Sequence, residues 1–111
     1  MTYTTQIEKS CYGLEAVTEI PLNKSTDEGA MVLRVTSSKR HSGTVSTSAS
    51  VIYRKDDNSF STVIFQDYSK TIAQGKVARI TEKSLAEFHA KALEAVPATL
   101  VEVAAHYQLA A

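Results

Sequence analysis

Cysteine, proline, glycine and tryptophan are all scarce in this chain of 111 residues, which has one Cys, two Pro, four Gly and no Trp. One Cys cannot form an internal disulfide, and no Cys/His spacing is typical of a zinc site. No apolar run approaches the roughly 18–20 residues that a membrane span needs. The first ten residues lack the basic-then-apolar pattern of a secretory signal. We therefore expect one domain over residues 1–111, in the reducing cytoplasm and without membrane contact.

Net charge is also absent, because 12 Lys and Arg balance 12 Asp and Glu. This balance excludes a strongly basic nucleic-acid arm or an acidic tail that acts through bulk charge. The charge is nevertheless uneven along the chain: it sums to −3 over residues 1–29, to +5 over 30–91 and to −2 over 92–111. The middle of the chain is therefore mildly basic.

Hydroxyl side chains are abundant, since Ser and Thr make up 24 of the 111 residues and 9 of the 15 residues from Thr36 to Ser50. A disordered linker is one interpretation of such a tract. The tract holds little Gly or Pro, however, and it runs into an alternating pattern that includes Val45, Thr47, Ala49 and Val51. Such alternation predicts a strand with one buried face and one wet face.

Four further strands are predicted, and polar turn-forming segments separate them. The strands cover residues 12–20, 30–36, 59–67 and 76–81, and Pro21 is expected to end the first of them or place it at an edge. The expected loops are 23–29, 37–43 and 55–59. Strands joined in this way most simply form an antiparallel meander.

The last third of the chain changes to a helical period. Thr81 is a plausible N-cap, and apolar residues follow at helical spacing as far as Val96. Pro97 then breaks that helix or opens a second one, whose apolar face includes Leu100, Val103, Ala104 and Tyr107. The predicted fold class is α+β, an antiparallel β-meander of four to five strands followed by two C-terminal helices.

One face of this sheet is expected to be polar and cationic. If Met31, Leu33 and Val35 face the helices, Arg34 points the other way. By the same parity Ser46, Ser48, Ser50 and Arg54 share the face of Arg34, and Phe60, Tyr53 or Tyr68 are candidates for an aromatic there. Cations and hydroxyls contact phosphates and aromatic rings stack on unpaired bases, so the face suits single-stranded nucleic acid. A solvated face rich in Ser, Thr and Arg is the other interpretation.

A resemblance points the same way. The segment from Gly75 to Phe88 resembles the end of the single-stranded-DNA-binding core of the positive cofactor four coactivators, and the Whirly proteins of plants have a similar architecture. The resemblance covers about residues 30–96, although Val77 replaces a family glycine and Leu85 a tryptophan. In it, Lys76 matches the loop lysine, Ala78 and Ile80 the inward positions of a last strand, Thr81 the cap, and Leu85 and Phe88 the apolar helix positions. It implies a homo-oligomer that forms through its helices and binds single strands on its sheet, without catalysis or a cofactor.

The predicted function is accordingly that of a non-enzymatic module for single-stranded DNA or RNA. The candidate binding residues are Arg34, Lys39, Arg40, Arg54, Lys55, Lys76 and Arg79. Two alternatives stay open: a small oligomeric structural or adaptor protein of the phage or mobile-element type, and a small ligand-binding α+β domain.

No catalytic or metal site is predicted from the reactive residues. The three histidines have no metal-ligand spacing, although His41 beside Arg40 could reach a phosphate. Cys11 has no activating base that the sequence can place, and the Asp56–Asp57 pair lies in an expected turn. We therefore expect no metal and no cofactor.

Overall fold

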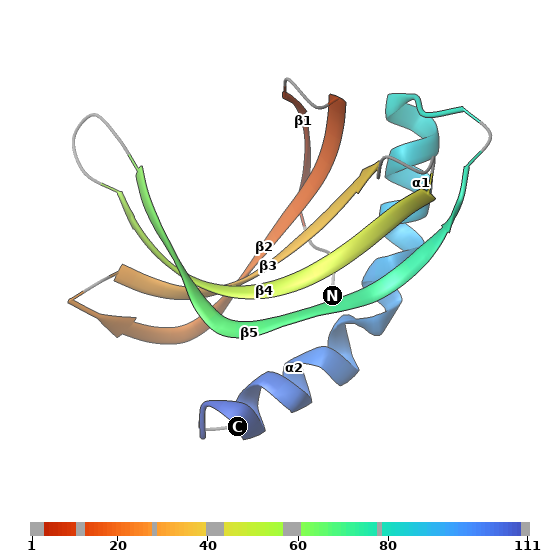
Figure 1. Ribbon diagram of the computed structural model, residues 1–111. Coiled ribbons are helices and arrows are strands. Elements are labelled where there is room, and N and C mark those ends of the chain that lie inside the picture. Colours follow the sequence, from red (N-terminus) through yellow and green to blue (C-terminus); the bar gives the residue numbers. More distant parts are fainter. Residues whose placement is uncertain are drawn as a thin grey trace.

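The structure is a computed structural model that describes residues 4–10, 13–27, 29–39, 44–56, 61–77 and 79–109. Its elements in chain order are β1 (Thr5–Ser10), β2 (Gly13–Thr26), β3 (Gly29–Lys39), β4 (Thr44–Asp56), β5 (Ser61–Lys76), α1 (Glu82–Ala92), η1 (Leu93–Ala95) and α2 (Val96–His106). The strands form one antiparallel sheet in the order β1-β2-β3-β4-β5, and the helices follow it (Figure 1). The predicted α+β meander is confirmed, and the turn η1 joins the two predicted helices into one bent segment.

The prediction missed one strand and placed another wrongly. β1 was not predicted, and the strand expected at 76–81 is absent from the described residues of that segment, because Lys76 is the last residue of β5. Lys76 pairs with Thr44, which is the first residue of β4. Beyond that point β4 offers no backbone to pair with, so the alternating residues that follow cannot extend the sheet. The last strand that the family resemblance implies is therefore not formed there.

Two of the long strands contain irregularities that bend them. β2 runs on past Pro21, with a register shift between Pro21 and Ser25. Pro21 does not end the strand, but it lies beyond the last β1 pair at Thr18, at an edge of the described sheet, which is the other predicted outcome. In β5 the pairing jumps from Phe65, opposite Ile52, to Ser69, opposite Ser50. Bulges of this kind increase strand bending, and Figure 1 shows β5 curving strongly along the sheet.

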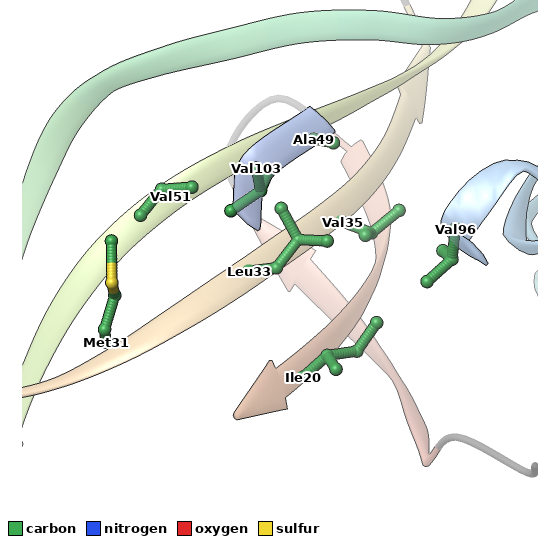
Figure 2. Close-up of a cluster of buried hydrophobic side chains, with 8 residues drawn as sticks. All are labelled: Ile20, Met31, Leu33, Val35, Ala49, Val51, Val96 and Val103. Atoms are coloured by element: carbon green, nitrogen blue, oxygen red, sulfur yellow. The ribbon is translucent and has the colours of Figure 1, made fainter. Parts of the chain in front are cut away.

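The core lies between one sheet face and the helical segment. Alternate residues of β2, β3 and β4 point to this side, which confirms the predicted inward parity. The main buried cluster contains Ile20, Met31, Leu33, Val35, Ala49, Val51, Val96 and Val103 (Figure 2). Burying an aliphatic side chain of this size contributes about 1.5–3 kcal/mol, so the cluster is the principal source of stability.

The start of α1 is defined by a reciprocal cap. The Thr81 hydroxyl accepts a hydrogen bond from the Ser84 backbone N–H at 3.1 Å, and the Ser84 hydroxyl accepts one from the Thr81 N–H at 2.9 Å. The predicted N-cap is therefore confirmed. Leu85 is fully buried in a second cluster with Ala16 and Val45, which fixes α1 over one end of the sheet.

Candidate nucleic-acid interface

The sheet face opposite the helices, here called the polar face, carries side chains from all five strands. Its defining residues are Glu19, Arg34, Thr36, Ser48, Ser50 and Arg54. The register places Arg34 opposite Ser50 and Thr36 opposite Ser48, so the predicted parity of Arg34, the serines and Arg54 is confirmed. The two cavities on this face are lined by strand residues and by Thr4, which precedes β1.

The two arginines of the polar face converge on one carboxylate. Arg54 Nη2 donates to Glu19 Oε2 at 2.8 Å, and Arg34 Nε lies 3.9 Å from the same oxygen. Glu19 is opposite Arg34 in the β2–β3 register. Both guanidinium groups are partly covered by protein, and part of their charge is neutralised within the chain. Arg34 and Arg54 are thus brought together as predicted, but in an ion-pair cluster that the sequence did not indicate.

Two shallow cavities lie along the polar face. One, of about 320 Å³, is lined by Arg34, Arg54 and Glu19 together with Thr4, Gln6, Glu8 and Val17. The other, of about 270 Å³, is lined by Glu15, Arg34, Thr36, Ser48, Ser50 and Phe65. Arg34 borders both cavities, so the two form neighbouring hollows on one surface.

The aromatic ring on the polar face is Phe65, which is not one of the three predicted aromatic residues. Phe65 is 65% exposed and lies opposite Ile52 in the β4–β5 register. Tyr53 and Tyr68 pack instead against the main core cluster on the helix side, so their proposed place on the polar face is wrong. Phe60 lies outside the described residues. The sequence from Thr62 to Phe65 is apolar or β-branched at every position, so it shows no alternation that could assign Phe65 to a face.

The exposed lysines and arginine at one end of the sheet form a group, here called the basic end: Lys9, Lys39, Lys76 and Arg79. Lys76, opposite Thr44, has the parity of the polar face, whereas Lys39, opposite the buried Val45, and Lys9, opposite Leu14, have the parity of the helix side. The three lysines end β1, β3 and β5 or lie one residue from the end. Alternate strands are about 10 Å apart, so these cations are spaced across the whole sheet. Among the described residues none of the four is in an ion pair. Lys9 was missed because β1 was missed.

The other predicted cations lie elsewhere. Lys55 is exposed near the opposite end of the sheet, where it pairs with Thr62. Arg40 and His41 lie outside the described residues, as does Cys11. The seven predicted binding residues therefore do not form one cluster: the structure places Arg34 and Arg54 on the face, and Lys39, Lys76 and Arg79 at the basic end.

A serine–histidine pair lies inside the protein rather than on its surface. His89 of α1 is fully buried, with Nε2 at 2.7 Å from Thr18 Oγ1 and Nδ1 at 2.6 Å from Ser37 Oγ. The Ser37 hydroxyl is also hydrogen-bonded to Thr47, with 2.6 Å between Ser37 Oγ and Thr47 Oγ1. Ser37 is also fully buried, so no substrate can reach its hydroxyl. The pair ties α1 to the sheet and is not a nucleophilic centre.

A second histidine contact holds α2 to the bend of β5. Tyr107 donates its hydroxyl hydrogen to Asp67 at 2.7 Å and accepts from the Tyr68 backbone N–H at 2.9 Å. His106 Nε2 lies 3.0 Å from the same carboxylate. The hydrogen bond from Tyr107, followed by that from His106, lowers the pKa of Asp67. These contacts hold the C-terminal end of α2 against β5.

No family model, curated protein or solved structure matches this chain. The resemblance to the positive cofactor four and Whirly proteins therefore stays a prediction. Within the described residues, none of the helices is both long and apolar enough to cross a membrane.

Proposed function

We propose that this chain is a non-enzymatic module that binds single-stranded nucleic acid across the polar face and the basic end. The observation that carries the proposal is Phe65, a largely exposed ring beside a cavity lined with the hydroxyls of Ser48 and Ser50. An unpaired base can stack on such a ring, at about 1–3 kcal/mol per base. Hydroxyl groups next to it can bind phosphate oxygens.

The charges indicate where the backbone would run. Glu19 already offsets the arginines of the polar face, so the stronger phosphate contacts are expected at the basic end. Lys76 connects the two regions, because it pairs with Thr44 at the end of the serine-rich strand β4. A strand that passes from Lys76 towards Phe65 would meet a cation first, then hydroxyls, then the ring.

Charge-removal variants test the phosphate contacts. We expect Lys39→Ala and Lys76→Ala each to weaken the binding of fluorescently labelled oligothymidylate and to reduce the salt slope by about 0.7–1. Lys24→Ala is the matched control, because Lys24 is equally exposed but lies at the far end of β2. Equal effects of all three variants would show that the basic end is not the phosphate site.

A second pair of variants tests the stacking contact. Phe65→Ala should weaken binding about fivefold or more, as expected for the loss of one base–ring stack. The control is Val101→Ala, an exposed apolar residue of α2, on the other side of the sheet. The proposal is wrong if the loss of the Phe65 ring leaves affinity unchanged.

We further propose a cytoplasmic location, where a chain with a single cysteine needs no disulfide.

The mixed charge of the polar face favours a second candidate, an oligomeric structural or adaptor protein that does not bind nucleic acid. Glu8, Glu15 and Glu19 line the same cavities as the two arginines. Carboxylates in these positions repel phosphate, and a mixed face suits a protein partner instead. This candidate predicts no oligonucleotide binding even at low salt.

A further inference from the structure

The outer edge of β5 is a second surface with binding capacity. Within the described part of the chain, β5 pairs with β4 alone, and it is the last strand of the sheet. Near its middle the edge is occupied, because the Tyr68 N–H donates to Tyr107. The stretch from Thr71 to Gly75 has no charged residue and no proline. Unprotected edges of this kind accept a further strand.

A groove runs beside this stretch of β5. It has a volume of about 550 Å³ and lies between the strand and the helical segment. Most of its lining is apolar or small: Ile72, Ala73, Phe88, Ala92 and Ala95. The three alanines leave room for close approach. Strand edge and apolar groove together form one continuous surface that could be covered by a partner.

Two residues of opposite charge also line the groove, and their arrangement indicates which partner would cover it. Lys91 and Glu94 line it on the helical side, one turn apart. Neither side chain has a hydrogen bond or an ion pair to any described residue. If two copies of the helical segment pack antiparallel with a two-fold axis between residues 92 and 93, residue 91 of one copy faces residue 94 of the other. Lys91 and Glu94 would then satisfy each other twice, once on each side of the axis.

We propose that this surface is the interface of a homodimer, in which the β5 edges pair antiparallel and the two grooves close over one another. Such an interface is isologous, since each copy contributes the same strand and the same charged pair. It would extend the sheet across both copies and leave the polar face and the basic end of each copy accessible. The dimer is independent of nucleic-acid binding.

Charge reversal tests this arrangement directly, with the dimer dissociation constant measured by sedimentation equilibrium. Lys91→Glu and Glu94→Lys each place like charges together twice per dimer, so each should raise the dissociation constant about tenfold or more. An equimolar mixture of the two variants should recover wild-type affinity as a heterodimer, because each then supplies the charge that the other lacks. The double variant K91E/E94K should recover it as a homodimer.

The matched control is Glu87→Lys, a reversal at an exposed position of α1 that does not line the groove. It should leave the dissociation constant unchanged. A folding defect in either variant would persist in the mixture, because both chains still carry their substitutions. Recovery of affinity in the mixture would therefore show that the single variants are folded. A wild-type chain that stays monomeric up to about 100 µM overturns the proposal, as does a dimer that the single reversals do not weaken.

Discussion

His89 Nδ1 lies 2.6 Å from Ser37 Oγ, although 52 residues separate them in the chain and neither is exposed. Through Nε2 the same ring reaches Thr18, so one imidazole of α1 bonds to β2 and β3. A buried imidazole that uses both nitrogens in this way is a specific anchor, because its loss leaves two buried hydroxyls with one partner fewer.

This anchor makes the stability of the protein depend on pH. Burial lowers the pKa of His89 from 6.5 to about 4. Between these values the unfolded chain binds a proton that the folded chain does not. We therefore expect the free energy of unfolding to decrease as pH falls through this window, by up to about 3 kcal/mol. Urea unfolding at about pH 7 and about pH 4.5 measures the difference.

The control variant is His89→Gln, because a glutamine amide keeps a donor and an acceptor but does not titrate. It should be less stable than the wild type at neutral pH and should lose most of the pH dependence. Asp67 does not contribute in this window, since its pKa lies below the ordinary 3.8 and its stabilising charge is lost only at lower pH. An unchanged slope in the variant would exclude His89 as the cause.

Two tyrosines that flank the bend in β5 should respond oppositely to loss of the hydroxyl. Tyr107→Phe removes the hydrogen bonds to Asp67 and to the Tyr68 N–H and should destabilise the protein by about 1–3 kcal/mol. The Tyr68 hydroxyl is buried with no hydrogen-bond partner in the described structure, so Tyr68→Phe should be neutral or stabilising. Thermal unfolding of both variants provides the comparison, and equal losses would contradict the assigned contacts.

Two glycines with similar backbone angles provide a test of close packing at the β2–β3 turn. Gly13 and Gly29 have φ values of 121° and 128°, so alanine is strained at both. A Cβ at Gly13 meets open space, whereas one at Gly29 meets the carbonyl of Arg54. We expect Gly29→Ala to cost about 2 kcal/mol more than Gly13→Ala in denaturant unfolding. Similar losses would show that strain alone matters.

The carboxylate of Glu19 should restrain nucleic-acid binding. Glu19→Gln leaves Arg34 and Arg54 without their shared anion, so we expect several-fold tighter binding of an oligonucleotide at low salt and a steeper salt dependence. The control is Glu102→Gln, which removes the same charge from an exposed ion pair with Lys70 on the helix side. Weaker or unchanged binding in the Glu19 variant would count against phosphate contacts on the polar face.

Side-chain periodicity was sufficient to predict the central strands and the helices, because these bury one regular face. Met31, Leu33 and Val35 alternate cleanly, and the cap at Thr81 has a local signature. β1 was missed because its sequence holds one aliphatic residue, Ile7, among polar ones. The segment 76–81 alternates as well as a true strand does, but pairing depends on where β4 begins, and a local pattern does not contain that information.

The candidate site was predictable only in part, for a related reason. Parity alone places Arg34 and Arg54 on one face. Their shared contact with Glu19 depends on the register of three strands, and loop residues outside the strand patterns determine that register. Phe65 was assigned to a strand but not to the polar face, because its neighbours Val63 and Ile64 are also apolar and the segment shows no alternation.

The most direct test of single-strand binding is a fluorescence anisotropy titration of labelled oligothymidylate with the wild-type protein at two salt concentrations. We predict saturable binding at about 50 mM salt that weakens as salt rises, with a log–log slope of about −2 to −3 for three or four phosphate contacts. No binding at low salt, or an affinity that does not change with salt, would contradict the proposed function.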